Sequence, residues 1–160
     1  MDDSTSPQPA FSDDDYRVIA DFRARLREFL HFSDEAARDA GISPQQHQLL
    51  LAIRGFAGDG DPTIGDLANA LQIRHHSCVG LINRLEQNGY VRRAASTEDS
   101  RKVHVLITPA GEQILARLTR AHQREHQQLH SVVEALVKLD RSNSDAPLPL
   151  YHADVHCAFA

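Results

Sequence analysis

Two long stretches of this sequence each carry one apolar stripe at helical spacing, and they flank the rest of the chain. The first extends over about 14–40 and the second over about 109–138. Apolar residues that recur on one face at about 100° per residue predict an amphipathic helix. Helices this long have more apolar surface than the segment between them can cover. We therefore expect a partner to pack against them.

Between the long helices, the sequence predicts three shorter helices and then two strands. Ser43 and Thr63 are N-cap residues that begin the first two helices. The third helix runs over 75–88 and ends at Gly89. This order of helices and hairpin is typical of a winged helix-turn-helix, whose second helix enters the major groove of DNA. The two strands are expected near 90–94 and 103–107.

The predicted fold class is therefore mainly α with a small β-hairpin wing, in which a winged helix-turn-helix lies between long N- and C-terminal helices. The expected segments are a disordered acidic tail (1–12), a long N-terminal helix (13–42), the DNA-binding domain (43–108), a long C-terminal helix (109–139) and a tail of uncertain structure (140–160).

Charge is distributed unevenly along the chain. The 160 residues contain 17 Lys/Arg and 22 Asp/Glu, which gives a formal net charge of −5. Residues 72–104 hold six Lys/Arg against three Asp/Glu, so this segment has a net charge of +3. Local positive charge on an acidic body favours a specific electrostatic footprint over indiscriminate binding to nucleic acid.

The helix predicted over 75–88 has two different faces. One face is apolar, whereas the other contains no carboxylate and no large apolar residue. Gly80 lies near the centre of this second face, where a bulky side chain would hold the helix away from DNA. A solvated helix face is the alternative explanation, but the neighbouring helix and the basic hairpin favour DNA. The candidate contacts on this face are His76, Ser77, Gly80, Asn83, Arg84 and Gln87.

The loop between the predicted strands carries Arg101 and Lys102. A helix in the major groove brings the following hairpin toward the adjacent minor groove, whose narrow A·T-rich segments attract arginine. Asp99 is placed to orient the Arg101 guanidinium through a charge-assisted hydrogen bond. We therefore expect the wing, residues 95–103, to be the second contact with DNA.

Several motifs between Ser43 and Thr108 point to a known family. They are SPQQHQLLLAI, TIGDLANALQIRHHSCVGLINRLEQNGYVRR, and a D-x-R wing followed by alternating residues and ITPAG. In these motifs the chain resembles the MarR family of bacterial winged-helix repressors. The long outer helices agree with the dimerisation elements of that family, so the resemblance covers about 14–139.

The resemblance implies a specific function and a specific set of contacts. The chain would form a homodimer on a pseudopalindromic operator, as a double-stranded-DNA-binding repressor. A small ligand bound between the dimerisation helices and the DNA-binding lobe would release it. The implied helix contacts are Arg74, Ser77, Asn83 and Arg84, with Arg101 in the minor groove.

Aromatic and histidine residues along the helical stripes suggest where that ligand binds. By family analogy, the candidate effector pocket comprises Phe22, Phe29, His47 and His122, which would suit a small aromatic or phenolic acid. Core packing explains the same phenylalanines without a ligand.

His122 and His126 lie four residues apart on one face, so a metal-responsive protein is the alternative function if two more ligands converge. The other interpretation is that both histidines are hydrogen-bonded residues of an interface or a pocket and bind no metal.

The sequence argues against catalysis and against a membrane protein. It contains no nucleophile, base and orienting group with credible spacing, and no glycine-rich phosphate loop. We therefore expect neither an enzyme nor a cofactor. No apolar run approaches the ~20 residues of a membrane span, and the N-terminus lacks the features of a signal peptide. These patterns predict a cytoplasmic protein with no membrane partner.

Overall fold

The computed structural model describes residues 11–95 and 102–143. The predicted tails up to residue 10 and from 144 onward lie outside these ranges, as do the wing residues Asp99 and Arg101. The elements in chain order are α1 (Asp13–Asp39), α2 (Pro44–Arg54), α3 (Ile64–Ala70), α4 (His75–Gln87), β1 (Val91–Ala95), β2 (Val103–Ile107), α5 (Pro109–Ala121) and α6 (Gln123–Asn143).

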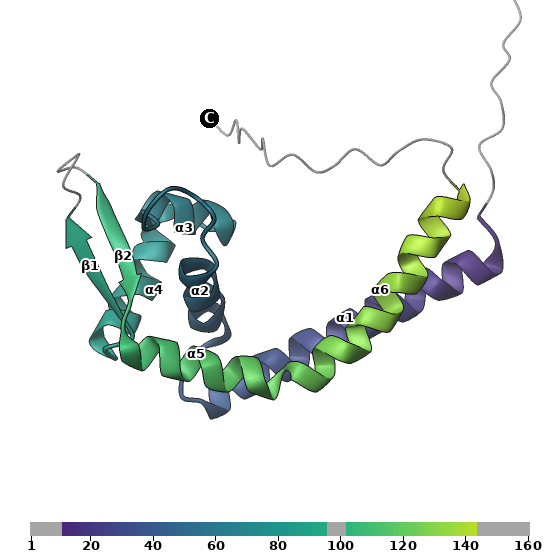
Figure 1. Cartoon of the computed structure of the whole chain (residues 1–160), viewed down its shortest axis with the longest axis horizontal. Helices are drawn as coiled ribbons and strands as arrows, with labels where there is room; N and C mark the ends of the chain where they lie inside the picture. The colour runs from purple at the N-terminus through teal and green to yellow at the C-terminus, as the bar shows by residue number, and fades with distance from the viewer. Residues whose placement is uncertain (1–10, 96–101, 144–160) are drawn as a thin grey trace, which may run out of the picture.

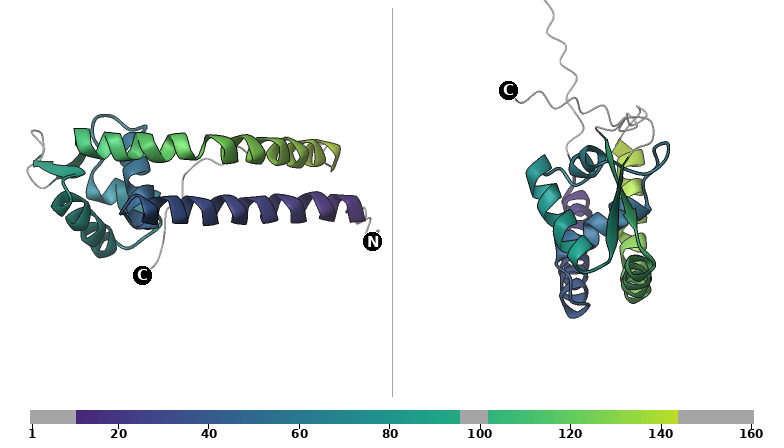
Figure 2. Two further views of the ribbon diagram at one scale, coloured as in Figure 1. Left: turned by 90° about the horizontal axis from the view of Figure 1, so that it is seen from below. Right: turned by 90° about the vertical axis from the view of Figure 1, so that its left-hand side faces the viewer.

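The molecule consists of a lobe and a stem (Figure 1). The lobe contains α2, α3, α4 and the hairpin, and the stem is formed by α1 and α6, which lie side by side and run in opposite directions (Figure 2). Helix α5 passes from the hairpin to the stem. The predicted fold class, a winged helix-turn-helix between long N- and C-terminal helices, is confirmed. Within 11–95 and 102–143, no helix combines the length and apolarity that a membrane span requires.

Local capping residues begin the helices where the sequence predicts. The Ser43 and Thr63 side chains accept hydrogen bonds from the backbone N–H groups of the third helical residue in α2 and α3, at 3.2 Å in each case. Gly41 and Gly89 adopt φ angles of +82° and +75° and follow the ends of α1 and α4. These positions explain the confirmed helix ends, because a left-handed conformation after a helix favours glycine.

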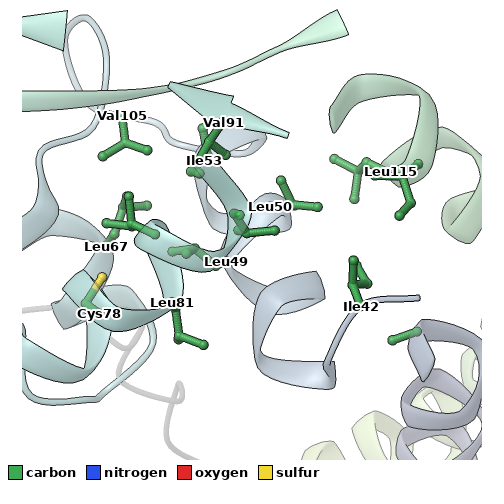
Figure 3. Packing of buried hydrophobic residues seen from close by; sticks show 14 of the residues in the cluster. Ile42, Leu49, Leu50, Ile53, Leu67, Cys78, Leu81, Val91, Val105 and Leu115 are labelled. Atoms are coloured by element: carbon green, nitrogen blue, oxygen red, sulfur yellow. The ribbon is translucent and has the colours of Figure 1, made fainter. Parts of the chain in front are cut away.

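The lobe is held together by one apolar core. Its fully buried side chains come from α2, α3, α4 and both strands (Figure 3). Cys78 on α4 belongs to this core, and burial raises the pKa of its thiol. The cysteine therefore acts as a small apolar filler. The largest fully buried residues are Leu49, Leu50, Leu67, Ile82, Leu85, Val91 and Val105.

Strand β2 of the hairpin is paired along both of its edges. Strands β1 and β2 pair antiparallel, with Val91 opposite Ile107 and Ala95 opposite Val103. On the other edge of β2, the Val105 N–H donates to the Pro62 carbonyl at 2.9 Å, and His104 forms a bridge with Thr63. The wing therefore emerges from a base fixed to the helix-turn-helix.

The C-terminal helix differs from the prediction of one helix to about 138. It breaks at His122 into α5 and α6, and α6 continues to Asn143. His122 Nδ1 lies 2.5 Å from the Leu118 carbonyl, so the side chain of this residue also engages the helix backbone where the break occurs. The predicted tail, residues 140–160, therefore starts too early, because α6 extends past residue 140 to Asn143. At the N-terminus, Ser12 is the N-cap of α1 and not part of a tail.

The start of α5 is packed directly against the start of β1. The Thr108 N–H donates to the Tyr90 carbonyl at 3.0 Å, and the Thr108 hydroxyl donates to the Gly89 carbonyl at 2.6 Å. A Cβ atom on Gly111 would lie 2.1 Å from the Tyr90 oxygen. Only glycine therefore permits this approach.

Replacing Gly111 by alanine should lower the free energy of unfolding by about 1–3 kcal/mol, because the added methyl group overpacks against a fixed carbonyl. Urea denaturation measures this loss. Gly65→Ala is the matched control, since the nearest atom to its Cβ would be Thr63 Oγ1 at 3.7 Å. The control should be neutral or slightly stabilising. Equal stability of Gly111→Ala and the parent protein would contradict the proposed packing constraint.

Candidate nucleic-acid interface

Helix α4 presents one buried face and one exposed face, as the sequence predicts. Cys78, Leu81, Ile82 and Leu85 are enclosed in the core. The predicted contacts on the opposite side are solvent-exposed, apart from half-buried Gly80. Since all of them belong to one helix held by its apolar face, the structure brings them together on one surface. The exposed members are Arg74, His76, Ser77, Asn83, Arg84 and Gln87.

Helix α4 begins without the side-chain cap that α1, α2, α3 and α5 have. Helices α1, α2, α3 and α5 each begin with a side chain that accepts a backbone hydrogen bond. Arg74 occupies this position in α4, makes no side-chain cap and precedes a first turn without an acid. Unpaired N–H groups and the helix dipole favour an anion at such an end. The phosphate backbone of DNA has the required charge.

Arg84 folds back along the exposed face of α4. Its Nε donates to the Gly80 carbonyl at 3.1 Å. A Cβ atom on Gly80 would lie 3.6 Å from the Arg84 Nη2, which is ordinary contact. Packing within the chain therefore does not require this glycine, and its role as a clearance for DNA remains a prediction.

An ion pair beside this face was missed by the sequence analysis. Arg93 on β1 pairs with Glu86 on α4, and its backbone N–H donates to Glu86 Oε1 at 3.0 Å. Arg93 Nη2 also donates to Asn83 Oδ1 at 2.7 Å. Strand alternation was the available signal, because it places Arg93 on the same side as buried Val91 and so requires a partner for its charge.

The hairpin region carries further exposed basic residues. Arg92 on β1 and Lys102, which directly precedes β2, are both solvent-exposed. The contact of Lys102 with DNA stays a prediction. The roles of Asp99 and Arg101 stay predictions, since both residues lie outside the ranges that the structure describes.

Comparison with known proteins identifies the family of this fold. A family model described as the MarR family matches residues 40–102. A relative from Mycobacterium bovis, the uncharacterised HTH-type transcriptional regulator Mb0904, is 31% identical over 136 residues, covering 83% of this chain and 87% of the relative. The chain belongs to the MarR family. It is a DNA-binding transcriptional regulator and not an enzyme.

Solved structures share the MarR fold at low sequence identity. A mutant MarR from E. coli complexed with operator DNA matches with a TM-score of 0.61 at 23% identity, covering 75% of this chain and 88% of that chain. BpsR from Bordetella bronchiseptica, whose DNA binding is regulated by 6-hydroxynicotinic acid, matches with a TM-score of 0.58 at 23% identity, covering 78% and 91%. These likenesses show the common architecture.

The predicted effector residues meet at the junction of lobe and stem. His47 on α2 and His122 between α5 and α6 are 4% and 3% exposed, and their ring centroids lie 5.5 Å apart. The Phe29 ring of α1 lies 5.8 Å from that of His122. Phe22 precedes Phe29 by seven residues on α1, so it lies about 10 Å from Phe29 along the helix axis. The structure thus brings three of the four residues together.

Two nitrogen atoms at this junction have no hydrogen-bond partner within the described chain, namely His47 Nδ1 and His122 Nε2. Buried polar atoms are rarely left without a hydrogen bond, so each of these nitrogens requires a partner from outside the described chain, such as a water molecule or a ligand. The metal alternative finds no support. His122 and His126 have ring centroids 6.0 Å apart, but no group of three or more metal-ligating side chains forms within 11–95 and 102–143.

The stability of this junction should depend on pH. Burial, followed by the neighbouring His122, lowers the pKa of His47 from its ordinary value of 6.5, and Asp34 offsets part of this effect. The unfolded chain therefore takes up a proton below pH 6.5 that folded His47 resists. The contribution of His47 to the free energy of unfolding is fully present above this pH. It should fall by up to about 1.4 kcal/mol for each pH unit below it.

Denaturant titrations between pH 7.5 and about pH 5, at one protein concentration, measure this dependence. The neutral variant His47→Gln should flatten the fall. His31→Gln is the control, because His31 has an exposed side chain on α1. The control should retain the dependence of the parent protein. Parallel pH curves for His47→Gln and the parent protein would rule out His47 as the group responsible.

Proposed function

We propose that this MarR-family regulator is a homodimeric repressor that binds a pseudopalindromic operator and is released by a small effector. In this proposal α4 reads the major groove, and the wing reaches the adjacent minor groove through Arg101. The exposed face of α4 is the observation that carries the proposal. It is polar, contains no carboxylate and is held in one orientation by the core behind it.

The proposed dimer accounts for the exposed apolar residues of the stem. Helices α1 and α6 pack along each other, yet Leu30, Val133 and Val137 stay 47%, 41% and 44% exposed. Val133 and Val137 lie four residues apart and so share one face of α6. A second copy covering this face would set two α4 helices on one side of the dimer, where they can enter successive major grooves about 34 Å apart.

The proposed effector would act at the junction of His47, His122 and Phe29. This part rests on the two unpaired nitrogens and on the regulation of BpsR by 6-hydroxynicotinic acid. The nearby pocket between α1 and α6 has a volume of about 170 Å³, which is below the ~300 Å³ typical of ligand sites. An effector would therefore select a more open junction. A thermal-shift screen of small aromatic acids tests this part, and no response from any acid counts against it.

Replacing Arg84 by alanine should weaken operator binding by about 1–3 kcal/mol, because the guanidinium lies on the face that meets DNA. The duplex is one that the parent protein selects from a random-sequence library, and gel-shift titration at fixed salt measures the affinity. Arg25→Ala is the charge-matched control, since Arg25 is an exposed residue of the stem that pairs with Glu28. Its affinity should stay unchanged. Equal affinities for both variants would argue against the α4 face.

Replacing Val133 by glutamate should shift the protein from dimer to monomer, because a charge on an interface core resists desolvation. Sedimentation velocity measures the change in mass. Gln127→Glu is the control, as it adds the same charge at an exposed polar position of α6. This variant should remain dimeric. If Val133→Glu sediments like the parent protein, the proposed interface is wrong.

A further inference from the structure

We propose that Arg93 is a positioning residue that sets which end of the Asn83 side-chain amide meets DNA. Through its hydrogen bond it turns the Asn83 oxygen inward and the NH2 group outward, so that Asn83 recognises an acceptor atom on the duplex. This inference rests on the proposed function in one respect only, namely that the exposed face of α4 contacts DNA.

The chemistry of the two side chains decides the orientation of the amide. A guanidinium has five N–H donors and no acceptor, whereas a carboxamide has an acceptor oxygen and a donor NH2 group. Arg93 Nη2 lies 2.7 Å from the Asn83 oxygen. The flipped amide would place donor against donor at this distance. The two N–H donors of Asn83 are therefore directed away from Arg93.

Arg93 is itself held in place by several contacts. Its Nη1 pairs with Glu86, and its backbone N–H donates to the other oxygen of that carboxylate at 3.0 Å. In the hairpin it stands opposite fully buried Val105. Its side chain is only 26% exposed. Because the guanidinium is fixed before DNA arrives, Asn83 is oriented in advance of binding.

The ion pair also explains how a carboxylate is tolerated beside a DNA-binding face. Glu86 neutralises the charge of Arg93, and each of the two terminal nitrogens of the guanidinium already donates to a neighbouring side chain. In the proposed arrangement Arg93 therefore acts on Asn83 and not as a phosphate clamp. Its effect on affinity should pass through Asn83 and should not change the number of counterions released on binding.

An outward NH2 group restricts what Asn83 can read. Asparagine recognises adenine by donating to N7 while its oxygen accepts from N6. With that oxygen directed at Arg93, Asn83 cannot make both adenine contacts. Its remaining donors match single acceptors, which in the major groove are N7 of either purine, O6 of guanine and O4 of thymine. A phosphate oxygen presents the same chemistry. The recognised class is thus a hydrogen-bond acceptor, and base and phosphate can be separated by experiment.

The test is a mutant cycle that leaves net charge unchanged. The paired substitution Arg93→Met with Glu86→Gln removes the ion pair, Asn83→Ala removes the amide, and a third protein carries all three changes. Affinity is measured for the duplex selected by the parent protein from a random-sequence library, over a range of salt. Arg54→Met with Glu112→Gln is the matched control, because this ion pair joins α2 to α5 at 3.0 Å without touching α4's exposed face.

We expect the paired substitution and Asn83→Ala each to lower affinity about tenfold. The protein with all three changes should bind no more than about twofold worse than Asn83→Ala alone, since both changes remove one contact. The salt dependence of the paired variant should equal that of the parent protein. The control pair should leave affinity within about twofold. Multiplicative losses, or full affinity in the paired variant, would overturn the inference.

Repeating the selection with the paired variant identifies the acceptor. Loss of preference at one base pair per half-site assigns a base edge, whereas a uniform loss with unchanged preferences assigns a phosphate oxygen, and either result supports the inference. If the paired variant does not fold, Arg93→Lys replaces it, because lysine lacks the planar pair of terminal nitrogens that bond to Glu86 and Asn83 in Arg93. Arg93→Lys binding like the parent protein would then overturn the inference. If the parent protein selects no sequence at all, the proposed function itself fails.

Discussion

The burial of one face of α4 is the constraint on which the DNA-binding lobe depends. Ile82 and Leu85 are fully enclosed, and α4 packs against α2, α3 and β1. A helix with one face committed to a close-packed core cannot rotate about its axis. The inward residues therefore decide which residues point outward. Because the same packing places β1 beside α4, Arg93 can reach back to the exposed face and hold Asn83.

A second constraint couples the lobe to the stem. His47 belongs to the lobe and His122 to the break between α5 and α6, yet the two rings are buried together. Burial disfavours the charged form of an imidazole, so a proton or a ligand that reaches this pair acts on both parts at once. A change in the angle between lobe and stem would move α4 relative to its counterpart in a dimer. In the proposed function, this junction is where an effector would alter DNA binding.

Most helix positions were predictable from the sequence, whereas several contacts at the site were not. Ser43 and Thr63 predict the starts of α2 and α3 because capping acts within one turn. The break at His122 was missed because the apolar stripe continues across it, and it coincides with ring contacts to residues on other helices. Asn83 was predicted to contact DNA directly. Its hydrogen bond to Arg93 was not predictable, because the two residues are ten positions apart and lie on different elements. Asp99 and Arg101 remain predictions.

The sequence by itself determined the order of the elements, the two faces of α4 and the surplus apolar surface of the long helices. These features follow from periodicity and capping, which depend on neighbours a few residues apart. Only the tertiary structure decided the break at His122, the burial of two imidazole nitrogens without a partner in the described part of the chain, and the orientation of the Asn83 amide. Each of these depends on which polar atoms are brought together by burial, and that is set by the packing of elements distant in the chain.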